Sequence, residues 1–130
     1  MGVLAALLAA SLVAQDKDQK SAAAGPRIRV EPQSFDFGKA AQNKTLRKEF
    51  SIRNFGNADL VIESVSTTCG CTAALLDSKV VKPGGTTPLR VSLETRAYKG
   101  RVERSVMVRS NDPETNLVEV KVEASVEAPN

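Results

Sequence analysis

Histidine is absent from the 130 residues of this chain. Without it, the sequence cannot build a Ser-His-Asp or Cys-His nucleophile system or a zinc site that contains histidine. Tryptophan is also absent, and aromatic residues make up only 4% of the sequence, so the core has to be aliphatic. These absences predict a protein that is not an enzyme and that needs no cofactor.

A strong excess of one charge is missing too. The chain carries 18 basic and 15 acidic residues, a net charge of +3, and the two signs are interspersed along the strands. A nucleic-acid-binding protein usually gathers its Lys and Arg on one face and, for single strands, adds aromatic residues between them. We therefore expect a protein partner and no nucleic acid, and the oligomeric state stays open.

The segment Gly2–Ala14 consists of small and apolar residues and carries no charge. It is shorter than the roughly 20 residues that span a bilayer, and its length is typical of the apolar region of a signal peptide. No basic residue follows Met1, and Leu12 stands where a small residue is preferred for cleavage after Ala14. A frayed apolar helix and a membrane anchor are the alternatives. We expect residues 1–14 to be a signal peptide, with no stable membrane span after cleavage and an extracytoplasmic location: periplasm, cell surface or secreted.

The rest of the chain has ordinary globular composition, with 42% hydrophobic and 25% charged residues. Residues 15–25 are polar and then alanine-rich, which is typical of a linker. The length suits one domain, which we place at residues 26–130.

Short segments with apolar residues at every second position fill this domain. This period of two predicts strands with one buried and one wet face. The expected strands are Arg27–Glu31, Phe35–Gly38, Thr45–Arg53, Leu60–Ser66, Leu89–Leu93, Val102–Val108 and Val118–Val126. Turns are expected at Asn54–Asp59, Lys82–Gly85 and Ser110–Pro113, which are rich in Gly, Pro, Asn and Asp.

No helical crossover separates these segments, so the fold class is all-β. We predict an immunoglobulin-like antiparallel β-sandwich of seven or eight strands. Leu60–Ser66 is expected to be buried on both faces. Lys48 and Arg104 interrupt the apolar stripes of their strands.

Five motifs carry a resemblance that covers roughly Arg27 to Val126. They are Phe35-Asp36-Phe37-Gly38, Ile52-Arg53-Asn54-Phe55-Gly56-Asn57-Ala58-Asp59-Leu60, Cys69-Gly70-Cys71-Thr72, Lys82-Pro83-Gly84 and Ser110-Asn111-Asp112-Pro113. In these the chain resembles a bacterial family of exported immunoglobulin-like domains of unassigned function with a Cys-Gly-Cys-Thr motif. It is distantly similar to sandwiches of the ASPM/SPD-2/Hydin and major-sperm-protein type. The resemblance implies fold and export, and it brings no catalytic residues with it.

Cys69 and Cys71 are the one unusual chemical feature. In an extended chain residues i and i+2 project to the same side, so the two sulfur atoms can meet, and Gly70 gives the backbone freedom to tighten the turn. A structural disulfide, two free thiols, a thiol–disulfide exchange site and a Cu(I) site remain open. For exchange, Lys79 or Lys82 would lower a thiol pKa if the loop folds back.

The function that these observations favour is a non-catalytic, exported binding or structural module with an unknown ligand. Binding by strand addition along an open edge suits such a sandwich. The alternative is a thiol-disulfide-active or Cu(I)-handling protein that uses the loop Cys69-Gly70-Cys71-Thr72.

Overall fold

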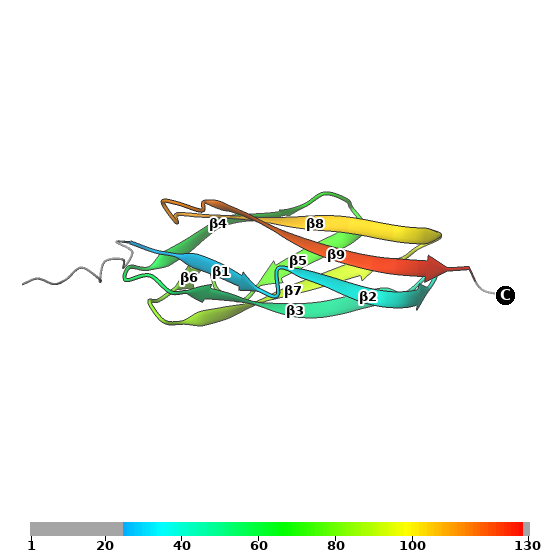
Figure 1. The fold of residues 1–130 in the computed structure, drawn as a ribbon, viewed down its shortest axis with the longest axis horizontal. Helices are drawn as coiled ribbons and strands as arrows, with labels where there is room; N and C mark the ends of the chain where they lie inside the picture. Colours follow the sequence, from blue (N-terminus) through cyan, green and yellow to red (C-terminus); the bar gives the residue numbers. More distant parts are fainter. Residues whose placement is uncertain (1–24, 129–130) are drawn as a thin grey trace, which may run out of the picture.

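The computed structural model describes residues 25–128, and these form nine strands and no helix (Figure 1). The strands are β1 (Ile28–Glu31), β2 (Ser34–Ala41), β3 (Thr45–Asn54), β4 (Leu60–Thr67), β5 (Thr72–Leu76), β6 (Val80–Val81), β7 (Thr86–Glu94), β8 (Gly100–Ser110) and β9 (Leu117–Glu127). The expected signal peptide and most of the expected linker lie outside the described residues. Within residues 25–128 there is no helix that could cross a membrane.

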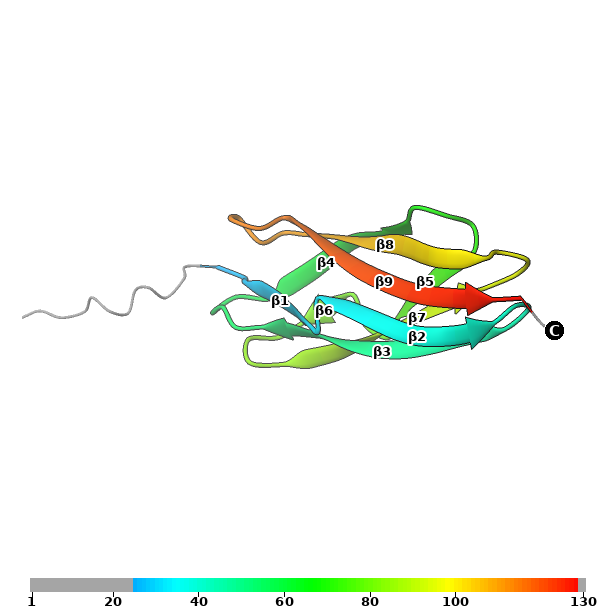
Figure 2. The same ribbon diagram turned by 45° about the vertical axis from the view of Figure 1, so that its right-hand side comes forward.

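The strands form two sheets that lie face to face (Figures 1 and 2). One sheet has the order β1-β3-β7-β5, and the other has the order β2-β9-β8-β4-β6. This arrangement confirms the predicted all-β, immunoglobulin-like sandwich. The three expected turns lie between strands, as predicted.

Two details of the architecture differ from the prediction. Strands β5 and β6 were not predicted, because β5 is short and alanine-rich and β6 has only two residues. In addition, β2 pairs with β9 in parallel, whereas the other pairs are antiparallel. The chain leaves the first sheet after β1 and joins the second, so that β2 runs beside β9 in the same direction (Figure 2).

The valine ladders point inward, and their side chains fill the space between the sheets. Burial alternates strictly along β7 and over most of β8 and β9, as the period of two predicts. The buried side chains form two clusters. The main cluster consists of Ile28, Val30, Phe50, Ile52, Leu60, Ile62, Val81, Leu89, Val91, Val106, Val108, Val118, Val120 and Val122. The cysteine cluster consists of Cys71, Leu93, Val102, Ala124 and Val126, with Phe37, Leu46, Cys69 and Tyr98 packed against it.

The expectation that Leu60–Ser66 is buried on both faces is wrong. In β4, Leu60 and Ile62 are buried, but Val61 is 36% exposed. The strand lies in the second sheet between β8 and β6, so only one of its faces meets the opposing sheet. An unbroken apolar run therefore did not mean two buried faces here.

A buried carboxylate joins the turn after β8 to the start of β1. Asp112 accepts hydrogen bonds from the backbone N–H groups of Ile28 (2.8 Å), Glu114 (2.7 Å) and Thr115 (3.0 Å). Burial alone would raise the pKa of Asp112. These N–H donors and the nearby Arg27 outweigh burial and hold the pKa below its ordinary value.

Candidate functional site

The cysteines lie in the turn between β4 and β5. The turn is tight, since the N–H of Thr72 donates to the carbonyl of Cys69 (3.1 Å) and the hydroxyl of Thr67 donates to the same carbonyl (3.2 Å). The Cα atoms of Cys69 and Cys71 are 5.2 Å apart, and their sulfur atoms lie against each other. The N–H of Thr68 donates to the carbonyl of Ser105 (3.1 Å), which fastens the turn to β8.

The two sulfur atoms have different surroundings. Cys71 is 2% exposed within the cysteine cluster, whereas Cys69 is only half-buried. The Nε–H of Arg104 donates to Sγ of Cys71 at 3.3 Å. The Tyr98 hydroxyl lies 3.8 Å from Sγ of Cys69, and the Arg104 guanidinium stacks over the Tyr98 ring at 5.2 Å.

Arg104 is the site residue that sequence reasoning missed, although a signal for it was present. It is the residue that interrupts the valine stripe of β8, between Val102 and Val106. Because side chains alternate along a strand, a residue at this position points inward. The inward guanidinium therefore reaches Cys71 from the opposing sheet, while its Nη1 donates to the carbonyl of Glu103 (2.6 Å).

The other two residues of the motif have distinct places. Thr72 is buried, and its hydroxyl lies 3.6 Å from Sγ of Cys71. Gly70 is exposed, and its carbonyl accepts a hydrogen bond from Nη2 of Arg96 (3.2 Å). A Cβ atom at Gly70 would meet no atom within 4 Å, and its backbone is not in the left-handed region. Gly70 therefore does not adopt a left-handed conformation in this turn.

Lys79 and Lys82 do not approach the cysteines, contrary to the sequence-based suggestion. Lys79 and Lys82 flank β6, which pairs with the first residues of β4, whereas the cysteines follow the last residue of that strand. The loop does not fold back, because β5 carries the chain away from the cysteine turn along β7. The cation at the sulfur atoms is Arg104 instead.

The described part of the chain holds no group of three or more Cys, Asp or Glu side chains arranged for a metal ion. A Cu(I) ion at this turn would have Cys69 and Cys71 as its only protein thiolates. Two ligands make a weak site, and a second molecule would have to complete it.

The free edge of β5 is a second feature of interest. In an antiparallel ladder, backbone groups point alternately toward the partner strand and away from it. The N–H of Glu94 donates to the carbonyl of Cys71 (2.8 Å), and the N–H of Asp77 donates to that of Pro88. By this alternation Ala73 and Leu75 bond to β7, whereas Thr72, Ala74 and Leu76 turn their backbone groups to the open edge.

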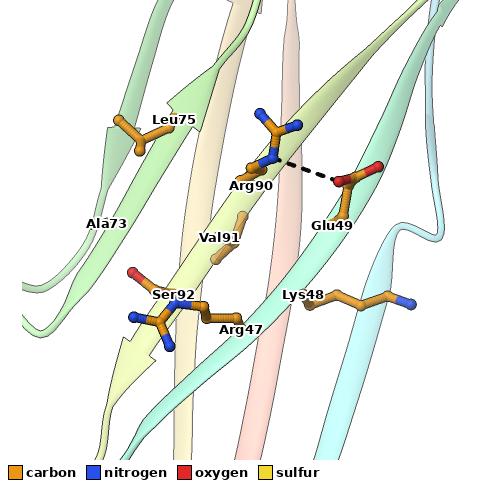
Figure 3. A pocket seen from close by; sticks show the side chains of 8 residues that line it. All are labelled: Arg47, Lys48, Glu49, Ala73, Leu75, Arg90, Val91 and Ser92. Carbon is orange, nitrogen blue, oxygen red and sulfur yellow. Dashed lines mark ion pairs between the residues drawn. The ribbon is translucent and has the colours of Figure 1, made fainter.

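The outer face beside this edge is hollowed. The hollow has a volume of about 300 Å³, and Ala73 and Leu75 line it from the β5 side. Figure 3 shows the side chains that line it. Leu75 is 69% exposed. Arg90 lies between β5 and β3 and pairs with Glu49 (3.5 Å) and with Asp77. The remaining lining residues are Arg47, Lys48, Val91 and Ser92.

The other three sheet edges carry features that discourage pairing with another chain. Strand β6 has two residues, and β1 has four residues, two of them charged, and is followed by Pro32. Strand β2 carries Asp36 and Lys39, and its register is broken between them. Strand β5 has neither a charged residue nor proline, and its register is regular. Among the described edge strands, β5 is the one that lacks features that discourage pairing with another chain.

This architecture is that of an immunoglobulin-like sandwich of the PapD-like and major-sperm-protein type. Residues 28–126 match the family described as protein of unknown function (DUF1573), and the chain belongs to that family. The resemblance inferred from the motifs is thereby confirmed. No curated protein sequence matches the chain.

Solved structures share the fold. A protein of unknown function from Porphyromonas gingivalis W83 is 24% identical, with a TM-score of 0.71, over 92% of this chain and 53% of that protein. The chain thus spans about half the length of that relative. The seventh PapD-like domain of human CEP192 is 10% identical, with a TM-score of 0.61, over 79% of this chain and 87% of that one. The Caenorhabditis elegans protein SSP-19, of the MSP-domain type, is 12% identical, with a TM-score of 0.54, over 76% of this chain and 98% of that one.

Proposed function

We propose that this domain is a non-catalytic binding module outside the cytoplasm, and that it takes up an extended segment of a protein partner as an additional strand beside β5. The observation that carries the proposal is the unprotected edge of β5 with exposed Leu75 next to it. An extended peptide gains main-chain hydrogen bonds from such an edge, and pockets beside it select alternate side chains.

The edge offers a defined set of backbone groups. The N–H groups of Ala74 and Leu76 are donors, and the carbonyls of Thr72, Ala74 and Leu76 are acceptors. The N–H of Thr72 is already bonded to the carbonyl of Cys69. A partner strand therefore has about five main-chain bonds available, each contributing roughly 0.5–1.5 kcal/mol.

The outer face of the sheet indicates the chemistry of the partner. A side chain of the added strand next to Leu75 is best apolar, because Leu75 would then be covered. Two residues before Leu75, Ala73 lies opposite Ser92 of β7, and Ser92 lies opposite Arg47 of β3, so the three residues form a row across the sheet. Arg47 extends toward Ser92 (Figure 3) and forms no ion pair with another described residue. We therefore propose that the partner segment carries an apolar and an acidic side chain two residues apart, both on the outer face of the added strand.

Two features of the sequence support the location and the absence of catalysis. The apolar segment Gly2–Ala14 has the length of a signal-peptide core. The chain has no histidine, so the commonest general base is missing.

The test is selection of short extended peptides from a random display library on the full chain, followed by hydrogen exchange of the complex. We expect peptides with an apolar and an acidic side chain two residues apart, and we expect them to protect the N–H groups of Ala74 and Leu76. Leu75→Lys and Ala74→Pro should each weaken binding about tenfold or more. Leu117→Lys, at an exposed leucine of the other sheet, is the matched control and should leave binding unchanged.

Two outcomes would contradict the proposal. In the first, selected peptides bind equally well to Leu75→Lys and Ala74→Pro. In the second, sedimentation shows that the wild-type chain is a dimer and that Ala74→Pro is a monomer. The occupant of the edge would then be a second copy of this chain and not a partner protein.

A further inference from the structure

We infer that Cys69 and Cys71 form a bridge that is a thiol–disulfide exchange site for an external dithiol, with Cys69 as the attacked sulfur and Cys71 as the leaving thiolate held by Arg104. This inference is independent of the β5 edge. It depends on the unequal surroundings of the two sulfur atoms and on the charged donor at one of them.

Exposure determines which sulfur an external thiolate can reach. Cys71 is enclosed by the cysteine cluster and is 2% exposed, whereas Cys69 is half-buried and precedes the exposed Gly70. An incoming thiolate has to contact the sulfur that it attacks. Attack therefore takes place at Cys69.

Hydrogen bonds determine which sulfur leaves more readily. Cys69 accepts a hydrogen bond from the N–H of Cys71 (3.2 Å) and has the Tyr98 hydroxyl at 3.8 Å, both neutral donors. Cys71 accepts from the guanidinium of Arg104 at 3.3 Å. A charged donor stabilises an anionic acceptor roughly twice as strongly as a neutral one. The negative charge is therefore better accommodated on Cys71.

The exchange proceeds in two steps. The first thiolate of the dithiol forms a bond to Sγ of Cys69, the bond between Cys69 and Cys71 breaks, and its electron pair leaves on Sγ of Cys71. The second thiolate of the dithiol then attacks the first sulfur of the dithiol, which is bonded to Sγ of Cys69 in the mixed disulfide. The bond to Cys69 breaks, and the thiolate of Cys69 takes a proton from water. The dithiol is oxidised to a disulfide, and the protein bridge is reduced by two electrons.

A guanidinium lies beside the turn that carries Cys69. Arg96 donates from Nη2 to the carbonyl of Gly70 (3.2 Å), so its guanidinium lies at the rim of the turn. An anionic thiolate is attracted to this position. Arg96 also pairs with Glu94 (3.4 Å), which reduces this attraction without removing it.

The first experiment locates the attacked sulfur. The full chain is incubated with reduced glutathione, quenched with acid, alkylated and mapped by mass spectrometry. We expect the mixed disulfide on Cys69, in roughly tenfold excess over Cys71. Among single variants treated with oxidised glutathione, Cys71→Ser should form the adduct and Cys69→Ser should form it much more slowly.

The second experiment tests Arg104. Reduction of the bridge by dithiothreitol should be roughly five- to tenfold slower in Arg104→Gln, because the leaving thiolate loses its charged donor. Arg104→Lys keeps the charge and should recover part of the rate. Arg109→Gln changes an exposed arginine of the same strand and serves as the control. Circular dichroism and thermal unfolding check that each variant is folded.

Three results would overturn the inference: two alkylatable thiols in the air-purified wild-type chain, adducts divided equally between Cys69 and Cys71, or equal reduction rates for folded Arg104→Gln and wild type. If Arg104→Gln does not fold, the adduct mapping decides: an adduct mainly on Cys69 supports the inference, and an adduct mainly on Cys71 contradicts it.

Discussion

The two clusters of the core differ in what they contain. The main cluster is aliphatic apart from Phe50, and its members come from both sheets. The cysteine cluster is smaller, and the polar groups of Cys69, Arg104 and Tyr98 lie beside it. Since the first holds the sheets together by apolar burial, the second is free to hold two sulfur atoms and an inward cation. The comparison indicates that the apolar core and the polar groups are separated along the sandwich.

The largest expected effect comes from removing one aromatic ring from each cluster. Phe50 is fully buried in the main cluster, and Phe50→Ala should lower the free energy of unfolding by about 3–5 kcal/mol. Tyr98 is half-buried, and Tyr98→Ala should cost about 1–2 kcal/mol, because less apolar area is lost. Urea denaturation measures both. Equal losses would mean that the cysteine cluster supports the fold as much as the main cluster does.

Two neighbouring prolines test the hydrogen-bond alternation of β5. The N–H of Ala73 bonds to β7, so Ala73→Pro should remove a ladder bond and cost about 2–3 kcal/mol. The N–H of Ala74 faces the open edge, where proline is tolerated, so Ala74→Pro should cost less than about 1 kcal/mol. Thermal unfolding of the pair measures the difference. The reverse order would show that the open-edge groups belong to Ala73 and Leu75.

How far the sequence predicts these features depends on how local each signal is. The alternation of apolar residues along β7, β8 and β9 is a local signal, and it predicted the fold class. The strand β5 lacked that signal, because alanine contrasts little with its neighbours. The parallel pairing of β2 with β9 depends on which sheet the chain joins after β1, which no local pattern reports.

The candidate site also combines a feature that the local sequence shows with one that it does not show. The spacing of Cys69 and Cys71 is visible in the sequence, but their partner Arg104 comes from a strand 33 residues away. Lys48 and Arg104 both interrupt the apolar stripes of their strands. Each places its cation over an aromatic ring: Lys48 over Phe35 at 4.4 Å and Arg104 over Tyr98 at 5.2 Å. In both cases, therefore, a charged residue at an inward position indicated a contact between a cation and an aromatic ring.

A smaller loss of stability is expected at Asp112, which accepts a hydrogen bond from the first residue of β1. Asp112→Asn loses a charged acceptor for the N–H of Ile28 and should cost about 1–3 kcal/mol at neutral pH. The folded-state pKa of Asp112 lies below its unfolded value, so its contribution is present above about pH 4 and is lost as pH falls through the folded pKa. The difference between wild type and variant should therefore shrink in acid. Urea denaturation across pH checks this, and a difference that is constant with pH would contradict it.

The smallest effect compares two exposed glycines. Gly84 has a φ of +79° in the turn before β7, so Gly84→Ala should cost about 1 kcal/mol. Gly70 is outside the left-handed region and has open space around it, so Gly70→Ala should change stability by less than about 0.5 kcal/mol. Dithiothreitol should reduce the bridge of Gly70→Ala as fast as that of the wild-type chain, because the hydrogen-bond donors to both sulfur atoms come from other residues. A slower reduction would mean that the cysteine turn has to move during exchange and that glycine permits this movement.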